Sequence, residues 1–195
     1  RGTEEMNHVM IDIETLDTVG TAVIVSIGAA MFDVATTSKP MIGDTFYSAV
    51  SIASQHDRTR SEDTIAWWGK QPAEAQAVFE EALSPTAPDL SDVLVSFSEW
   101  VRKNQDGSRS PSVWGNGATF DNVIVRHAYA QLGIPCPWHF SGDRCYRTLN
   151  SLALIPHWFV AERTGPKHHA LEDALYQARR ASMALGGVQA LRQQL

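Results

Sequence analysis

Residues 10–18 read MIDIETLDT, in which the acids Asp12 and Glu14 lie two positions apart among isoleucines. The alternation predicts a strand in which Ile11 and Ile13 face one side and the two acids face the other. The two acids are then roughly 6.5–7 Å apart along the chain. Because two ionised carboxylates at this separation repel each other, the stretch requires a compensating charge.

The sequence after this stretch predicts a sheet. Residues 21–34 form a nearly continuous apolar run rich in Val and Ile, which is typical of a strand covered on both faces. Residues 45–52, after a turn-rich segment, read as a third strand, and residues 112–116 read as one more. Three strands come first along the chain, and one more strand follows among helices. This order indicates a mixed sheet.

Helices are predicted in the rest of the chain. Caps, apolar periodicity and terminating Gly or Pro residues place them at residues 62–71 behind Ser61, 72–83 from Pro72, 90–101, 120–132 before Gly133, 148–155 before Pro156, and from near His169 onward. The fold class is therefore α/β, with a central mixed β-sheet flanked by α-helices. No linker divides the chain, so residues 6–195 are predicted to form one domain, and residues 1–5 are expected to be a non-native remnant before Met6.

Composition limits the functions that the chain can have. Of its 195 residues, 44% are hydrophobic and 19% are charged, as in an ordinary globular domain. No apolar run approaches the roughly 18 residues of a membrane span and no secretory signal is visible, so a cytoplasmic location and no membrane partner are expected. The two cysteines, Cys136 and Cys145, provide neither a disulfide framework nor a zinc site. The net charge of −6 argues against binding nucleic acid by bulk electrostatics and leaves local contact open.

Two later acids extend the acidic pattern of the first strand. Asp121 ends a glycine-rich bend in WGNGATFDN (residues 114–122), and Asp173 follows two histidines in PKHHALEDALYQA (residues 166–178). Taken singly, each acid has a structural explanation: a helix N-terminus, an exposed helix charge, or a strand end that faces water or an arginine. Taken together, the order D-x-E, D, H-x4-D is far more specific. A hard cation such as Mg²⁺ or Mn²⁺ needs anionic oxygen ligands of this kind.

With these motifs the sequence resembles the DEDDh exonuclease superfamily, which contains polymerase proofreading subunits, ribonuclease T and oligoribonuclease. The matching motifs are DIET at residues 12–15, NGATFD at 116–121 and HHALED at 168–173. Within the superfamily, the sequence is most similar to phage-type 3′-to-5′ exonucleases and to relatives that degrade RNA. The stretches that carry this similarity are DIETL, VIVSIGAAMFD, TIAWWGKQ, WGNGATFDN and RTL. The resemblance covers residues 7–182. It implies a ribonuclease H-like fold and hydrolytic release of nucleoside 5′-monophosphates from 3′ ends.

The resemblance also implies a centre with two divalent cations, Mg²⁺ or Mn²⁺. It assigns Asp12 to bridge the ions and Asp121 to hold the ion near the leaving group. Glu14 and Asp173 complete the site that activates water. His168 is implied as the general base, because an imidazole accepts a proton near neutral pH.

Two adjacent histidines are candidates for this base, and helical geometry alone favours His169. His169 lies four residues before Asp173 and would share its helix face, whereas His168 lies five residues before it. The family spacing selects His168, which would then lie on a loop ahead of the helix. In that case His169 is expected to cap the helix or to support the site from behind.

Six residues near these motifs are candidates for substrate contact. Adjacent tryptophans on a helix point about 100° apart, so one can pack inward while the other stacks on a base. The asparagines and the phenylalanine near the third acid could orient the terminal nucleotide, and the arginine of RTL could bind phosphate. Core, turn or surface roles are the alternatives. The six are Trp67, Trp68, Asn116, Phe120, Asn122 and Arg147.

The expected partner is nucleic acid with a free 3′ end, with single-stranded DNA ahead of RNA. An exoribonuclease is the alternative within the same chemistry, because the sequence does not show whether a protein group reads the 2′-hydroxyl. A non-catalytic nucleic-acid-binding module is the alternative from another class, and the presence of all four acids and the histidine argues against it. The tryptophans and the final segment GGVQALRQQL are compatible with a homodimer.

Overall fold

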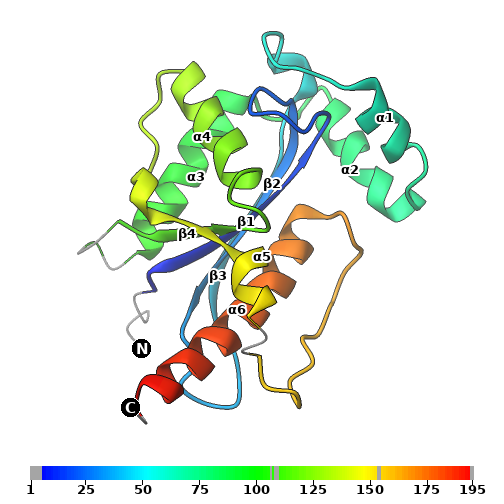
Figure 1. The fold of residues 1–195 in the computed structure, drawn as a ribbon. Helices are drawn as coiled ribbons and strands as arrows, with labels where there is room; N and C mark the ends of the chain where they lie inside the picture. Colours follow the sequence, from blue (N-terminus) through cyan, green and yellow to red (C-terminus); the bar gives the residue numbers. More distant parts are fainter. Residues whose placement is uncertain (1–5, 106, 108–109, 153–154, 194–195) are drawn as a thin grey trace.

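A mixed sheet runs through the centre of the computed structural model, which describes residues 6–105, 107, 110–152 and 155–193 (Figure 1). The predicted remnant at residues 1–5 lies outside this part of the chain. In spatial order the five strands are β3 (Met41–Ala49), β2 (Ile24–Asp33), β1 (His8–Thr15), β4 (Ser112–Gly115) and β5 (Asp143–Cys145). The central strand β1 is antiparallel to β2 and parallel to β4, so the sheet is mixed as predicted.

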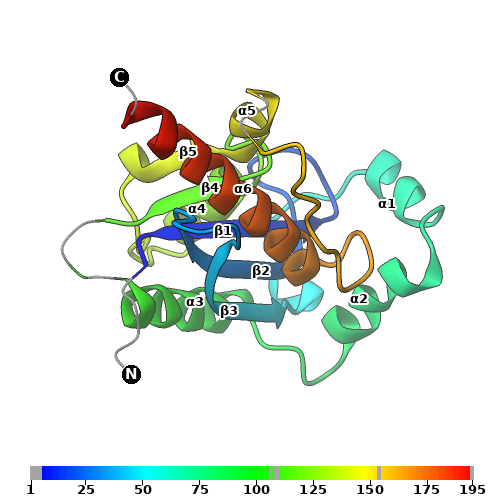
Figure 2. The ribbon, with the colours of Figure 1, turned by 90° about the horizontal axis from the view of Figure 1, so that it is seen from below.

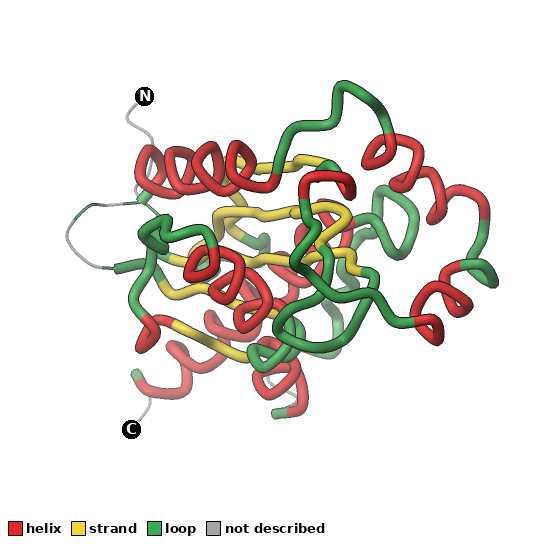
Figure 3. The backbone as a smooth tube through the Cα atoms, turned by 90° about the horizontal axis from the view of Figure 1, so that it is seen from above, coloured by secondary structure: helices red, strands yellow, loops and turns green. Residues whose placement is uncertain are grey.

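Helices cover both faces of the sheet. They are α1 (Glu62–Trp68), α2 (Ala73–Leu83), α3 (Leu90–Asn104), α4 (Asp121–Gln131), α5 (Tyr146–Ser151) and α6 (Ala170–Arg192), with 3₁₀ turns at Ile52–Ser54 and Phe140–Gly142. Helices α3 and α4 lie on one face and α5 and α6 on the other (Figure 1). Figure 2 shows α3 and α6 on opposite sides of the strands, and Figure 3 shows the strands enclosed between helices. The predicted α/β class is confirmed. Within the described residues, no helix has the length and apolar composition needed to cross a membrane.

Strand β1 separates two apolar cores, as its alternation predicts. Ile11 and Ile13 pack with residues of α3 and α4 in one core. Met10, on the opposite face, packs with residues of α5 and α6 in the other. Since Asp12 and Glu14 continue the face of Met10, they lie on the α6 side of the sheet.

The N-terminal end of α6 packs directly on β2 at Gly28. In the sheet register Gly28 is the partner of Asp12. A Cβ atom at Gly28 would collide with the backbone of Ala170 and Leu171, so a larger residue would push the helix away from the sheet. This close approach brings the first turn of α6, and the residues just before it, to the Asp12 side chain.

Three elements, besides shifts of a few residues at the ends of others, differ from the prediction. The third strand begins at Met41 rather than at residue 45, because the segment from Met41 continues the pairing with the end of β2. Strand β5 is absent from the sequence prediction, since three residues are too few to show an alternating pattern. The helix predicted at residues 148–155 is α5, which begins and ends earlier, and residues 153–154 lie outside the described part.

Candidate active site

A cavity of about 350 Å³ opens at the end of β1, beside the first turns of α4 and α6. All four predicted acids and His168 line it. Residues that are far apart in the sequence therefore meet at one place. The location agrees with the general preference of ligands for the carboxyl ends of strands in α/β proteins.

Strand β1 supplies the first two acids. Glu14 is 7% exposed, and burial, followed by the charges of Asp173 and Asp121, raises its pKa to about 8. Burial and the neighbouring acids also raise the pKa of Asp12 well above its usual range. A hydrogen bond from Gln177 Nε2 to Asp12 Oδ1, 2.8 Å long, acts in the opposite direction. Because both acids resist ionisation without a positive charge nearby, the site favours a bound cation.

Asp121 is the first residue of α4 and is 3% exposed. Burial raises its pKa to about 7, against the effect of hydrogen bonds from backbone N–H groups that include those of Ile13 and Asn116. A Cβ atom placed on Gly115 would lie 2.9 Å from Asp121 Oδ2. The glycine at the end of β4 thus makes room for this acid beside β1.

Asp173 lies in the first turn of α6, and both of its carboxylate oxygens have partners. Arg163 Nη1 lies 2.7 Å from Oδ1, and the backbone N–H of His168 donates to Oδ2 at 2.8 Å. His168 has a φ of 63°, in the left-handed region that few residues other than glycine adopt. Ligand atoms of Glu14, His168 and Asp173 all lie within 4.8 Å of one another. A strained turn before α6 thus accompanies the approach of the histidine to the acids.

His169 occupies a different environment. It is the N-cap residue of α6, but its side chain makes no capping hydrogen bond. Its ring instead stacks on Tyr47, with ring centroids 4.6 Å apart. His169 therefore occupies the cap position expected from the sequence, but its side chain stacks on Tyr47 and does not cap the helix. The acid cavity is lined by His168 and not by His169, which favours the histidine selected by the family spacing.

The two tryptophans of α1 point in different directions, as predicted. Trp68 is 4% exposed, and its Nε1–H donates to a backbone carbonyl oxygen of β1 at 2.9 Å. Trp67 is 42% exposed and meets His168 edge to face, with ring centroids 5.0 Å apart. Both tryptophans line a second cavity of about 490 Å³, which shares Glu14 and Phe120 with the acid cavity. Of the two, Trp67 presents the exposed ring.

Three of the other predicted contact residues, Asn116, Phe120 and Arg147, line the acid cavity. Arg147 is exposed, and its Nη2 donates to the carbonyl oxygen of Asn116 at 2.8 Å. Asn122 is fully buried, and its Nδ2 donates to a carbonyl oxygen of β4 and a carboxylate of β5. Asn122 therefore joins α4 to the sheet and is not among the residues that line the acid cavity.

The cavity is also lined by residues outside the predicted set, namely Ile13, Tyr146, Arg163, Tyr176 and Gln177. The Arg163 guanidinium, besides pairing with Asp173, lies 4.6 Å from the centroid of the Tyr176 ring. Tyr176 and Gln177 lie three and four residues after Asp173 on α6, so they share its helix face, and this spacing is visible in the sequence. Arg163 lies in the irregular segment before α6, where no periodicity indicates which way a side chain points.

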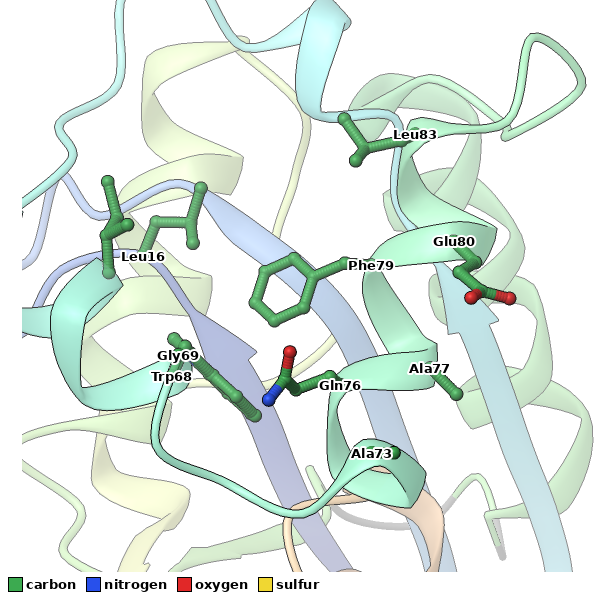
Figure 4. Close-up of a pocket in the computed structure, with 10 residues that line it drawn as sticks. Leu16, Trp68, Gly69, Ala73, Gln76, Ala77, Phe79, Glu80 and Leu83 are labelled. Atoms are coloured by element: carbon green, nitrogen blue, oxygen red, sulfur yellow. The ribbon is translucent and has the colours of Figure 1, made fainter.

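A larger cavity of about 550 Å³ lies between α1 and α2 (Figure 4). Phe79 and Gln76 point into it from α2, and Leu16 and Trp68 face them. Among the described residues that line it, Glu80 is the one ionisable group. Converging titratable groups, rather than volume, therefore identify the smaller cavity as the candidate active site.

The acid cavity fits a divalent cation. Its four carboxylates are the hard oxygen ligands that such ions prefer. Within the described ranges, the one ion pair that these acids form is that of Asp173 with Arg163, so most of their negative charge is not compensated by the chain. The residues that would hold the metal are Asp12, Glu14, Asp121 and Asp173.

A carboxylate cluster at the end of the central strand, with an imidazole at its edge, is the arrangement expected of metal-dependent DEDDh 3′-5′ exonucleases. A family model described as the 3′-5′ exoribonuclease Rv2179c-like domain matches residues 7–185. The chain therefore belongs to the Rv2179c-like family, and it is a 3′-5′ exonuclease. The resemblance stated from the sequence motifs is confirmed. No curated protein matches the chain in sequence.

Solved structures support the ribonuclease H-like fold. The nuclease domain of 3′hExo, a DEDDh family member bound to rAMP, matches with a TM-score of 0.57 and 16% identity, over 97% of this chain and 95% of that one. Cell-death related nuclease 4 matches with a TM-score of 0.57 and 14% identity, over 97% of this chain, which spans 64% of the nuclease. Exonuclease X in complex with 5′ overhanging duplex DNA matches with a TM-score of 0.51 and 17% identity, over 94% and 92% of the two chains.

The raised pKa values of the acids make the metal-free protein sensitive to pH. Burial raises the pKa of Glu14 to about 8 and that of Asp121 to about 7, whereas in the unfolded chain both ionise at ordinary acidic pH. Between these limits the folded state binds more protons, so we expect the free energy of unfolding to fall from about pH 5 to about pH 8, by up to about 1.4 kcal/mol per pH unit for each group. Urea unfolding in EDTA measures this slope.

A metal-loaded sample is the control for this pH dependence. A cation at the acids favours their ionised forms, so the slope should flatten or reverse when Mn²⁺ replaces EDTA. Metal-free stability that stays constant or rises over the same pH range would contradict the buried, mutually repelling arrangement of the acids.

Proposed function

We propose that the chain removes nucleoside 5′-monophosphates one at a time from the 3′ end of RNA, with two divalent cations, Mg²⁺ or Mn²⁺, held by the acid cavity. The observation that carries the proposal is the convergence of four carboxylates in one cavity with the His168 side chain beside them. Asp12, Glu14, Asp121 and Asp173 would hold the ions: Asp12 with Asp121 on the side of the leaving group, and Asp12 with Glu14 and Asp173 on the side of the attacking water.

The bound cations supply stabilisation of charge on the phosphoryl oxygens and a hydroxide near neutral pH. The chain provides the proton acceptor, since His168 takes a proton from the attacking water. The water oxygen bonds to phosphorus as the bond from phosphorus to the 3′ oxygen breaks. The departing 3′ oxygen takes a proton from solvent water, which leaves a 3′-hydroxyl on the shortened strand, and the phosphate stays on the released nucleoside 5′-monophosphate. Arg147, exposed at the cavity, contacts phosphate, and the exposed ring of Trp67 stacks on a base.

The choice of RNA rests on the description of the family as exoribonucleases. The sequence motifs alone placed single-stranded DNA first, and the solved relatives include one bound to rAMP and one in complex with DNA. Discrimination requires a protein group that reads the 2′-hydroxyl. RNA is the proposed substrate, and single-stranded DNA is the competing outcome of the test.

The test uses matched RNA and single-stranded DNA oligonucleotides, labelled at the 5′ end and incubated with Mg²⁺, Mn²⁺ or EDTA. A metal-dependent ladder that shortens from the 3′ end, faster on RNA, supports the proposal. If the DNA oligonucleotide is shortened faster, the proposed substrate becomes the 3′ end of single-stranded DNA. Absence of a ladder on either substrate, with nucleic-acid binding retained, would replace the enzyme with a binding module.

Replacing Trp67 with alanine is expected to weaken substrate binding. Stacking of one base on an aromatic ring contributes about 1–3 kcal/mol, so KM should rise between about 5-fold and 150-fold while kcat changes less. The matched variant is Trp68→Ala, which removes a buried ring and should lower the free energy of unfolding by about 3–5 kcal/mol. Steady-state kinetics and urea unfolding on both variants separate the two roles. An unchanged KM in Trp67→Ala would remove the stacking contact from the proposal.

The homodimer and the cytoplasmic location expected from the sequence are also part of the proposal. Exposed apolar side chains on separate elements, among them Leu83 of α2 and Leu191 of α6, offer surface that a second copy could cover. Light scattering coupled to size-exclusion chromatography measures the mass in solution directly.

A further inference from the structure

Gln177 lies behind the acid that the resemblance assigns to bridge the two ions. Its Nε2 lies 2.8 Å from Asp12 Oδ1, although the two residues are far apart in the sequence. The side chain lines the acid cavity and is 5% exposed. Gln177 also lies one helical turn after Asp173 on α6, so a rigid helix relates its amide to another acid of the cluster.

The other end of this amide has no partner. Within the described residues, Gln177 Oε1 is buried and accepts no hydrogen bond. The amide donates its N–H to Asp12, so its carbonyl oxygen faces away from this acid. A buried carbonyl without a partner is unfavourable, and an apolar side chain of the same length would avoid that loss. The unpartnered oxygen therefore indicates a group that arrives when the site is loaded.

We propose that Gln177 is a positioning residue of the exonuclease centre: its N–H holds Asp12 toward the cavity, and its carbonyl oxygen accepts a hydrogen bond from a water that enters with the divalent cation. This inference rests on the proposed function and extends it by one residue. The amide orients Asp12 by hydrogen bonding, and its free oxygen fixes the orientation of the water. Residues that orient metal ligands in this way commonly change metal affinity or activity by 10–100-fold when they are lost.

The experiment measures Mn²⁺ binding by isothermal titration calorimetry, without nucleic acid, in the wild-type protein and in Gln177→Met. Methionine keeps the length of the side chain and removes both hydrogen-bonding groups. We expect the affinity for Mn²⁺ to fall by about 10–100-fold. The melting temperature in EDTA should change little, because the lost hydrogen bond to Asp12 and the removal of a buried carbonyl without a partner act in opposite directions. Gln189→Leu, at an exposed position of the same helix, is the matched control and should change neither quantity.

Each outcome decides the proposal. A lower melting temperature in EDTA with unchanged Mn²⁺ affinity would assign Gln177 to packing and overturn the positioning role. If Gln177→Met does not fold, Gln177→Asn replaces it. Asparagine keeps the amide, but its shorter side chain withdraws the amide from Asp12. A Mn²⁺ affinity equal to that of the wild type in Gln177→Asn would also overturn the positioning role. A wild-type protein that neither binds Mn²⁺ nor cleaves nucleic acid would overturn the proposed function itself. If the wild type binds Mn²⁺ and cleaves nucleic acid, and Gln177→Met binds Mn²⁺ with the same affinity, only this inference is overturned.

Discussion

Replacing Asp12 with asparagine is expected to abolish cleavage and to stabilise the metal-free protein. The carboxylate faces three other acids in the same cavity, and burial together with their charges raises its pKa well above the usual range. Loss of the bridging ligand should lower kcat by at least about 10³-fold, the scale for removing one electrostatic stabiliser of a transition state. A neutral amide removes the repulsion, and each kcal/mol gained should raise the melting temperature in EDTA by about 2–4 °C.

The same two measurements on Asp33→Asn provide the control. Asp33 is the last residue of β2 and follows Phe32, which pairs with His8 at the start of β1. Glu14 lies near the other end of β1, so Asp33 is at the opposite end of the sheet from the acid cavity. Its substitution should leave both cleavage and the stabilising effect of Mn²⁺ unchanged. Cleavage by Asp12→Asn at the wild-type rate would remove this acid from the catalytic site. Loss of cleavage together with a lower melting temperature in EDTA would mean that Asp12 supports the fold rather than repelling its neighbours.

The alternating pattern around Asp12 was enough to predict the central strand and the face on which the acids lie. Alternation has a period of two, so Ile11 and Ile13 had to enter one core if Asp12 and Glu14 shared the other face. The meeting of these acids with Asp121 and Asp173 could not follow from periodicity, because it depends on which segments the fold brings together. The motif order supplied that information through the family resemblance, and the close approach at Gly28 is its physical basis.

The side chains around the acids were less predictable. Asn122 and Asn116 are equivalent in the sequence, since both flank the third acid, yet one is fully buried against β4 and β5 while the other lies at the cavity. Their difference arises from where the glycine-rich bend ends and α4 begins, and a pattern predicts such boundaries poorly. Gln177 carried a usable signal, four residues after Asp173 on the same helix face. Arg163 carried none, because the segment before α6 is irregular.

Replacing His168 with alanine is expected to lower kcat by about 10²–10⁴-fold, the usual contribution of a general base. Its imidazole lies with Glu14 and Asp173 in a group of ligand atoms within 4.8 Å, and it meets the ring of Trp67 edge to face. The acids remain in place in this variant, so the affinity for Mn²⁺ should change far less than kcat. Single-turnover cleavage and calorimetric titration with Mn²⁺ measure the two quantities separately.

The comparison with His169→Phe distinguishes a base from a general effect of altering this turn. A phenylalanine keeps an aromatic ring to stack on Tyr47, and the backbone hydrogen bond from the Asp173 N–H to the carbonyl oxygen of residue 169 does not depend on the side chain. Its kcat should therefore stay close to that of the wild type. If His169→Phe loses activity and His168→Ala keeps it, the base is the residue that shares the helix face of Asp173, and the family spacing misassigns it. If His168→Ala loses Mn²⁺ affinity in proportion to kcat, the imidazole acts as a metal ligand, because a pure proton acceptor has no reason to change the binding of the cation.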